Sequence, residues 1–348
     1  MGLQIREIVP RRPIQIKDLK NKTICIDAYN IIYQFLSNIR QPDGTPLKDS
    51  KGRITSHLSG LFYRNVNLIE DGLKIVYVFD GKPPELKGVT GEIREERKDE
   101  AAGKYAEARK EGDVEGMGRY ARQMVRITRE IVEESKELLT AMGIAVVQAP
   151  SEGESQAAYL ARTDPQGIYA VGSQDYDCLL FGAPRLIQNL TLSQRRKTAS
   201  GGYVEVFPEL IEMERVLNHL QINIDQLICI GILCGTDYNP GGVRGIGPKR
   251  ALQIVKLYKQ PVLIFESAMV RERMAEMGLS GGGFDWKAVF ELFHKPNVDT
   301  TARIEFPKVE LNEVRRILLE REFSEERINK QLERLEKAVE QRKQRTLF

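Results

Sequence analysis

Cysteine and histidine are scarce in this 348-residue chain, and neither is spaced for metal binding. The four cysteines, Cys25, Cys178, Cys229 and Cys234, form no CxxC pair and lie in apolar sequence. They are therefore predicted to be buried, reduced thiols rather than disulfides or zinc ligands. The three histidines lie far apart along the chain, without the spacing of a metal site.

Long apolar runs and a strong charge imbalance are also missing. No run reaches the length needed to cross a membrane, and the N-terminus has no apolar signal region. An intracellular protein without a membrane partner is therefore expected. The net charge is +3 and the pI is near 8.5, which does not by itself indicate nucleic-acid binding. Any surface that binds nucleic acid must come from local clusters of Lys and Arg.

Short apolar runs alternate with longer amphipathic segments over the first 190 residues. Such runs are typical of buried parallel strands, and the amphipathic segments at 56–71 and 125–142 are typical of helices. The pattern predicts an α/β fold with a mainly parallel central sheet flanked by helices. The predicted strands are Thr23 to Ile26, Lys74 to Phe79, Ile144 to Gln148, Ile168 to Val171 and Arg185 to Gln188.

Residues 81–130 differ from their surroundings. They are rich in Lys, Arg and Glu, have few large apolar residues, and contain glycines at 103, 112, 116 and 118. The segment is predicted to be helical, with too little apolar surface for a core element. A solvated helical insertion and a helical arch that orders around a substrate both fit this composition.

The carboxyl-terminal half becomes helical from Ile222 and then enters a glycine-rich stretch at 235–251 with basic ends. A charged amphipathic helix is predicted from Ser324 to Arg342. The short basic run Arg195 to Lys197 is interpreted as a solvated loop that could also contact duplex DNA.

Acidic residues follow the predicted strands at the points where the strands end. Asp27 and Asp80 end two of the runs, and Asp175 and Asp177 follow a third. Because the carboxyl ends of parallel strands face one edge of a sheet, these side chains are expected to converge there. Three further acids occupy comparable positions: Glu152 and Glu154 open a predicted helix, and Asp237 follows an apolar helix.

Seven acids at one edge would repel one another and raise their pKa values unless cations bound there. Mg²⁺ and Mn²⁺ prefer oxygen ligands. Two such ions can activate a water molecule and stabilise the leaving oxygen of a phosphodiester. The alternative, that each acid is a separate helix cap or ion-pair partner, explains the clustering less well.

At this point the chain resembles a known family. Ile26-Asp27-Ala28, Val78 to Pro84, Ala149 to Glu154, Ser173 to Asp177 and Gly235 to Tyr238 are similar to the signature blocks of flap endonucleases. Gly245 to Ala251 resembles the family's helix-two-turn-helix, and Phe323 to Arg327 resembles its C-terminal block. The match runs in order along the whole chain. The archaeal branch is the most similar because no long basic tail is present.

The resemblance implies a PIN-like 5′ nuclease fold and a set of site residues. Seven acids would bind two Mg²⁺ ions, with Mn²⁺ as a substitute: Asp27, Asp80, Glu152, Glu154, Asp175, Asp177 and Asp237. Lys87 matches the catalytic lysine of the arch. Arg94 matches the arch arginine, although the basic run is interrupted and Arg97 is a competing candidate.

Several residues would contact DNA. Tyr33 matches an aromatic residue that stacks on a base beside the cut, although a core tyrosine fits the sequence nearly as well. Arg40 matches a basic residue near the duplex junction. The glycine-rich loop would hold a phosphate and a monovalent cation such as K⁺, where the alternative is an ordinary turn. Its residues are Gly245, Gly247, Lys249 and Arg250.

The tail departs from the family pattern, which ends in a box that binds the sliding clamp PCNA. Gln344, Leu347 and Phe348 begin such a box, but the chain ends before the paired aromatic residues. Counting from Gln341 instead leaves the aliphatic position filled by Gln344. Both matches are incomplete, so weak clamp binding is expected.

The expected activity is 5′ flap endonuclease and 5′-to-3′ exonuclease cleavage of branched DNA, in Okazaki-fragment maturation and base-excision repair. A monomer is expected, cytoplasmic if archaeal. Sibling junction or bubble nucleases and a non-catalytic clamp-tethered scaffold are the alternatives. The predicted regions are an N-terminal nuclease region (1–98), an overlapping arch (82–130), an internal nuclease region (131–258) with the helix-two-turn-helix at 235–258, a C-terminal helical region (259–340) and a clamp-binding tail (341–348).

Overall fold

The computed structural model describes residues 2–41, 43–163, 167–191, 195–197, 202–277 and 284–345. The chain divides into two compact units, each assembled from three separate segments. Unit 1 comprises residues 1–14, 80–91 and 149–300, and unit 2 comprises residues 15–79, 92–148 and 301–348. The predicted regions follow the order of the chain, whereas each compact unit brings together segments that are distant in sequence.

Unit 2 contains three parallel strands in the order β2-β3-β4. Asp27 at the end of β2 pairs in register with Val78, and Phe79 pairs with Gln148. Tyr77 and Phe79 of β3 are fully buried, so this strand lies in the core of the unit. The elements of this unit are β2 (Thr23–Asp27), β3 (Lys74–Phe79), β4 (Ala145–Gln148), a 3₁₀ helix (Ile16–Leu19), α1 (Ala28–Asn38), α2 (Ser56–Glu70), α4 (Val114–Gln123), α5 (Arg129–Ala141), α14 (Leu311–Leu319), α15 (Glu325–Arg345) and most of α3 (Gly88–Glu111).

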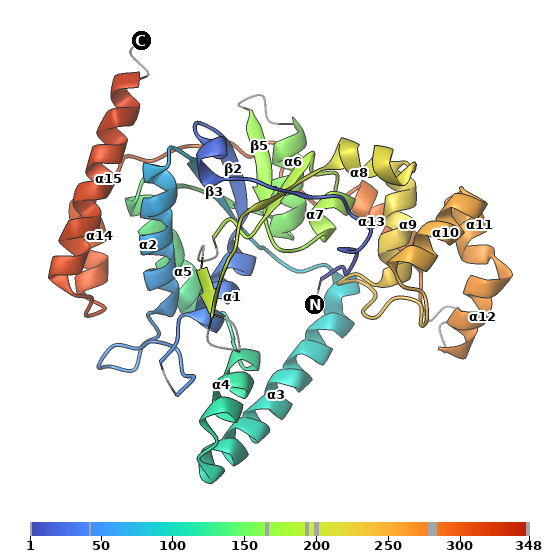
Figure 1. Cartoon of the computed structure of the whole chain (residues 1–348), viewed down its shortest axis with the longest axis horizontal. Helices are drawn as coiled ribbons and strands as arrows, with labels where there is room; N and C mark the ends of the chain where they lie inside the picture. The colour runs from blue at the N-terminus through green and yellow to red at the C-terminus, as the bar shows by residue number, and fades with distance from the viewer. Residues whose placement is uncertain are drawn as a thin grey trace. The chain divides into compact units, whose positions relative to one another are not determined.

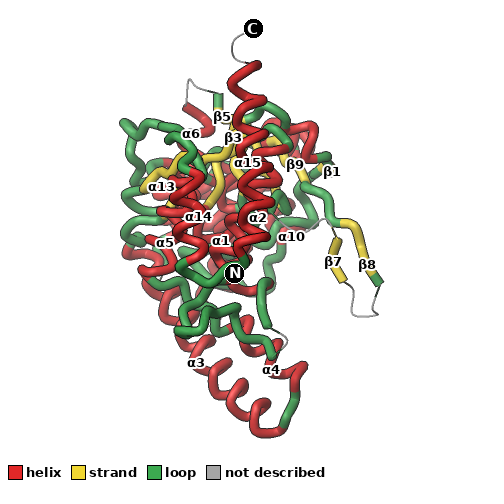
Figure 2. Tube along the Cα trace, turned by 90° about the vertical axis from the view of Figure 1, so that its left-hand side faces the viewer, coloured by secondary structure: helices red, strands yellow, loops and turns green. Residues whose placement is uncertain are grey.

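Helix α2 lies against α1, α5 and α15, and Figure 2 shows α15 running beside α2. The packing of α1 on α2 requires Gly60, because a methyl group there would lie 2.2 Å from the Phe35 ring. His57 is fully buried on α2, and its Nε2 lies 3.0 Å from the Glu134 carboxylate on α5. Glu134 also pairs with Arg321, which follows α14. This ionic network joins three parts of the unit.

The Lys/Arg/Glu-rich segment forms helices α3 and α4, so its helical prediction is confirmed. Figure 1 shows the two helices as a pair that extends away from α1 and the strands of unit 2. Asp113 begins α4 by accepting a hydrogen bond from Gly116 N at 2.9 Å. Arg126 ties the end of this segment back to α3 by ion pairs with Glu95 (3.1 Å) and Asp99 (2.8 Å).

Four strands of unit 1 pair in the order β1-β9-β6-β5, and β7 and β8 pair separately. β5 and β6 are parallel, whereas β9 and β1 are antiparallel to their neighbours. The elements are β1 (Arg12–Pro13), β5 (Ile168–Gly172), β6 (Arg185–Gln188), β7 (Arg195–Lys197), β8 (Tyr203–Glu205), β9 (Glu209–Glu212), a 3₁₀ helix (Glu85–Lys87), α6 (Gly153–Thr163), α7 (Asp177–Leu180), α8 (Met213–Leu220), α9 (Ile224–Cys234), α10 (Pro248–Tyr258), α11 (Pro261–Glu266), α12 (Ala268–Glu276) and α13 (Trp286–His294).

All five predicted strands are present, with ends that differ by at most one residue. One prediction is wrong: Arg195 to Lys197 is a strand, β7, that pairs with β8 in an antiparallel ribbon. Figure 2 shows this ribbon extending away from β9 and β1. A three-residue strand formed by basic residues has no apolar alternation, so sequence patterning could not detect it.

The four cysteines are unpaired. Cys25, Cys178 and Cys229 are buried as predicted, whereas Cys234 is half-buried. Among the described residues, no single helix is long and apolar enough to cross a membrane. Only α8 and α9 meet that criterion together, as a pair bent by 83°.

Candidate metal centre and nucleic-acid contacts

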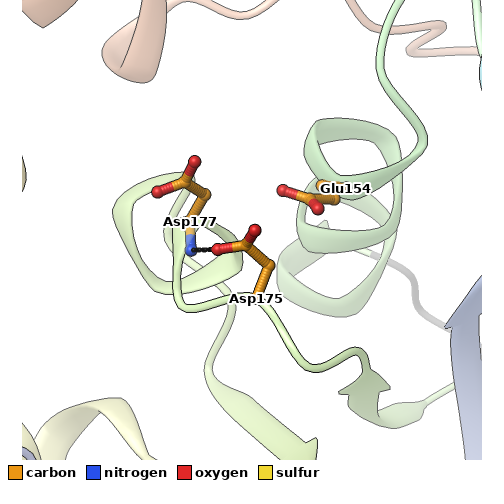
Figure 3. Close-up of side chains that lie close together, drawn as sticks. All are labelled: Glu154, Asp175 and Asp177. Carbon is orange, nitrogen blue, oxygen red and sulfur yellow. Dashed lines mark hydrogen bonds between the residues drawn. The ribbon is translucent and has the colours of Figure 1, made fainter. Parts of the chain in front are cut away.

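Three predicted metal ligands come together in unit 1. Asp175 follows β5, Asp177 begins α7, and Glu154 lies in the first turn of α6. One carboxylate oxygen from each lies within 4.8 Å of the others, as Figure 3 shows. The Asp177 backbone N–H donates to Asp175 Oδ1 at 3.1 Å, which holds the turn in shape. A parallel strand and a neighbouring helix thus direct three acids toward one point.

The electrostatics of this trio fit a cation. Burial raises the pKa of Asp177 well above its usual value, and the charges of Asp175 and Asp237 raise it further. Burial also raises the pKa of Asp175. Among the described residues, Asp177 Oδ1 is a buried oxygen with no hydrogen-bond partner. A buried acceptor without a donor is costly, and a hard divalent cation would remove that cost.

Lys87 lies among the remaining acids of unit 1. Its ammonium pairs with the Glu152 carboxylate and lies 3.1 Å from Asp237 Oδ2. Burial alone would lower the pKa of Lys87, but Glu152, Asp237 and Glu154 raise it above its usual value. The pKa of Glu152 is raised by burial and by Asp80 and Asp237, although Lys87 opposes that shift. Lys87 is therefore a fixed positive charge beside the acids.

Asp80 directly follows β3 and accepts a hydrogen bond from Gly153 N at 2.6 Å. This bond joins Asp80 to the start of α6, next to Glu154. Six of the seven predicted acids thus belong to unit 1. Asp27 belongs to unit 2, where it is buried and accepts a hydrogen bond from Asn30 N at 3.1 Å. Its part in a shared metal site stays a prediction.

Two neighbours of these acids were not predicted. Leu3 N donates to Asp175 Oδ1 at 3.3 Å, and a methyl group on Gly2 would lie 1.5 Å from Asp175 Oδ2. The start of the chain therefore packs directly on a candidate ligand. Thr90 is buried, and its hydroxyl donates to the Asp237 carbonyl. No local sequence pattern indicated either contact.

The glycine-rich loop of unit 1 contains glycines with positive φ and one glycine that caps a helix. Gly245 has φ +76°, which disfavours other residues, and Gly247 caps α10 with Pro248 at its first position. Lys249 and Arg250 are exposed on the first turn of α10. Lys249 Nζ lies 3.5 Å from Glu7 Oε2.

Arg250 is held by two acceptors, because it donates to the Gly245 carbonyl at 3.4 Å and to Met269 Sδ at 3.1 Å. Arg273 was missed by sequence reasoning. It donates from α12 to the Arg244 carbonyl at 3.0 Å, and no local pattern in the sequence of this helix indicates the contact.

The other predicted DNA contacts lie in unit 2. The Tyr33 side chain is 43% exposed on α1, which excludes a fully buried core tyrosine. Arg40 donates to the Ser37 carbonyl at 3.1 Å, and burial together with the charge of Arg122 on α4 lowers its pKa. Arg94 is half-buried on α3 and Arg97 is exposed. The two basic side chains Arg40 and Arg122 are thus close enough to repel each other.

The predicted clamp-binding residues cannot be placed. Leu347 and Phe348 lie outside the described residues. Gln344 belongs to α15, but its side chain lies outside the described part.

Comparison with known proteins agrees with the resemblance found in the sequence. Residues 2–101 match the XPG N-terminal domain and residues 143–237 match the XPG I-region. Flap endonuclease 1 of Aeropyrum pernix is 50% identical to this chain, covering 98% of this chain and 96% of its own length. Flap endonuclease 1 of Pyrococcus furiosus is 49% identical, covering 100% and 98%.

Solved structures show the same fold. Flap endonuclease-1 from Methanococcus jannaschii superposes with a TM-score of 0.72 at 38% identity, covering 98% of this chain and 100% of its own. The catalytic core of Rad2 in complex with DNA substrate has the same fold, with a TM-score of 0.68 at 23% identity, covering 96% of this chain and 100% of its own. The α/β prediction with a mainly parallel sheet flanked by helices is confirmed. With relatives of this identity along nearly its whole length, the chain belongs to the flap endonuclease 1 family.

Proposed function

We propose that this chain is a Mg²⁺-dependent nuclease that cuts 5′ flaps of branched DNA and has 5′-to-3′ exonuclease activity. The observation that carries the proposal is the trio of Glu154, Asp175 and Asp177, each with a carboxylate oxygen within 4.8 Å of the others. Asp177 also has a buried oxygen, Oδ1, without a hydrogen-bond partner among the described residues. Its family relatives are flap endonucleases, which favours branched DNA as the substrate. The proposed processes are Okazaki-fragment maturation and base-excision repair.

The trio and the acids beside it would hold two Mg²⁺ ions, with Mn²⁺ as a substitute. Glu152, Asp80 and Asp237 are the further ligands within unit 1, some through water. Asp27 keeps its predicted role on the strength of the family resemblance. When bound, such ions lower the pKa of an attacking water and stabilise the leaving oxygen. The protein's part is to gather negative charge in a buried place where only a cation satisfies it.

Lys87 and Arg94 supply fixed positive charge for the scissile phosphate. The ammonium of Lys87 is already desolvated beside Glu152 and Asp237, so it needs little reorganisation to stabilise a developing negative charge. Arg94 lies on α3 and keeps its predicted role as the arch arginine on the strength of the family resemblance, with Arg97 on the same helix as the competing candidate.

DNA on either side of the cut would be held by the exposed basic and aromatic residues. Tyr33 offers a half-exposed ring for stacking on a base, and Arg40 offers charge near the junction. The loop with Gly245 and Gly247 would hold a phosphate of the duplex and a monovalent cation such as K⁺. Lys249 and Arg250 would add charge at the start of α10.

The remaining proposals concern partners. A weak interaction of the tail with the sliding clamp PCNA follows from the incomplete box at Gln344. We propose that the protein works as an intracellular monomer.

The test is cleavage of end-labelled flap, nicked, bubble and four-way-junction DNAs, with Mg²⁺ and with a chelator. The flap substrate should be cut fastest, at the base of the flap, and only with the divalent ion. Preferential cutting of the bubble or the four-way junction would assign the chain to a sibling activity. Binding of flap DNA without any Mg²⁺-dependent cleavage would leave a non-catalytic scaffold.

A further inference from the structure

Helix α12 lies beside the glycine-rich loop and contacts it at three places. Arg273 Nη1 donates to the Arg244 carbonyl at 3.0 Å, and the Arg244 backbone N–H donates to Met277 Sδ at 3.1 Å. Arg250 Nη2 donates to Met269 Sδ at 3.1 Å. Figure 1 shows α10, α11 and α12 grouped together in unit 1. Helix α12 and Met277, the residue that follows it, thus reach both the loop and the start of α10.

The loop needs this support at its outermost part. Val243 and Ile246 are buried, and the Val243 N–H donates to the Leu233 carbonyl at 2.8 Å, which ties the loop to α9. Arg244 and Gly245 between them are exposed. Gly245 has φ +76°, and glycine restrains its own backbone less than any other residue. The outer turn is therefore the part whose conformation depends most on contacts from elsewhere.

The guanidinium of Arg273 lies directly against this glycine. A methyl group on Gly245 would lie 2.5 Å from Arg273 Nη1, so the absence of a side chain allows the guanidinium to reach the Arg244 carbonyl. With that carbonyl bound to Arg273, the following N–H groups are held in one direction. A phosphate site made of backbone N–H groups binds better when those groups are oriented before the ligand arrives.

We infer that Arg273 is a positioning residue for the duplex-binding loop, with Met277 and Met269 as secondary supports. It acts on the DNA through the backbone of Arg244 and Gly245. The inference rests on the proposed role of this loop in binding duplex phosphates, and it adds α12 to the machinery that holds DNA. Preorganisation of the loop increases its affinity for duplex DNA.

The variant Arg273→Met keeps the length of the side chain and removes its donors. Its matched control is Arg271→Met, which removes the same charge from an exposed position on the same helix. Affinity for a plain duplex is measured by fluorescence anisotropy, and backbone exchange at residues 244–246 is measured by hydrogen–deuterium exchange without DNA. For Arg273→Met we expect about fivefold weaker duplex binding, as for one lost hydrogen bond, and faster exchange in the loop.

Equal effects of Arg273→Met and Arg271→Met on affinity would overturn the inference, because charge alone would then explain them. Unchanged exchange in the loop would overturn it as well, since a direct contact with DNA leaves the free protein unaffected. If Arg273→Met unfolds α12, Arg273→Lys decides, because lysine keeps a donor. If Arg273→Lys folds normally and loses as much duplex affinity as Arg273→Met, the role of the hydrogen bond is refuted. Neither measurement requires cleavage, so failure of the proposed nuclease activity would be recognised separately.

Discussion

Replacing Asp177 with Asn should make the protein more stable in the absence of metal. The same change should abolish Mg²⁺-dependent cleavage of DNA. Asp177 is 2% exposed, and burial, Asp175 and Asp237 all raise its pKa. Asn has nearly the same shape but cannot ionise, so it removes a buried charge from a group of like charges. The backbone hydrogen bond from Asp177 N to Asp175 is kept in the variant.

The size of the effect follows from the separation of the acids. Two unit charges at the 4.8 Å limit repel by about 3.5 kcal/mol at an effective dielectric constant of about 20. Because raised pKa values leave some of these groups protonated, we expect a smaller net gain, about 1–3 kcal/mol at pH 8. That gain corresponds to a rise of a few degrees in Tm.

The gain should depend on pH in one direction. A raised folded-state pKa means that the favourable contribution of Asp177 is fully present below its unfolded pKa and is lost as pH rises through its folded pKa. Asn does not titrate, so the variant cannot lose that contribution. Its gain in stability over the wild type should therefore be absent near pH 4 and grow toward pH 8. Mg²⁺ should reduce the difference in stability between the variant and the wild type, because an ion at about 100 times its Kd stabilises the wild type by about 2.7 kcal/mol.

Thermal unfolding between pH 4 and pH 8, with chelator and with Mg²⁺, measures these effects. The control is Glu214→Gln, which removes an exposed charge from α8 and should change Tm little. A variant less stable than the wild type in chelator at pH 8 would show that the Asp177 carboxylate is structural. Equal stabilisation of the variant and the wild type by Mg²⁺ would remove Asp177 from the metal site.

Asp175→Ala should abolish cleavage and leave duplex binding largely intact, because phosphate contacts dominate affinity; near-normal turnover at saturating Mg²⁺ would exclude Asp175 as a ligand. Lys87→Ala should lower the single-turnover rate by about 10²-fold or more, and a change confined to KM would reduce Lys87 to a substrate-binding role. Changing both Lys249 and Arg250 to Ala should weaken double-flap binding and reduce the salt slope by about 1 per lost phosphate contact; an unaltered slope would place the loop away from the backbone. Hydrogen exchange should show residues 92–129 weakly protected without DNA and protected with it; strong protection in the free protein would make the arch rigid.

The sequence alone was sufficient for features that depend on neighbouring residues. The runs at 23–26 and 74–79 are apolar throughout because parallel strands are covered on both faces, and both became strands. Acids that directly follow a strand are confined to its carboxyl end, which is why Asp175 and Asp177 could be recognised as candidate ligands. Helices α3 and α4 were also predictable, since their composition favours helix.

Only the tertiary structure decided which distant residues meet. Lys87 pairs with Glu152 and Asp237, which lie 65 and 150 positions further along the chain, and no local pattern encodes such a pairing. The ribbon formed by β7 and the contact of Arg273 with the glycine-rich loop were equally invisible. Periodicity reports which face of an element is buried, whereas the partner of a charged side chain is determined by how the elements pack.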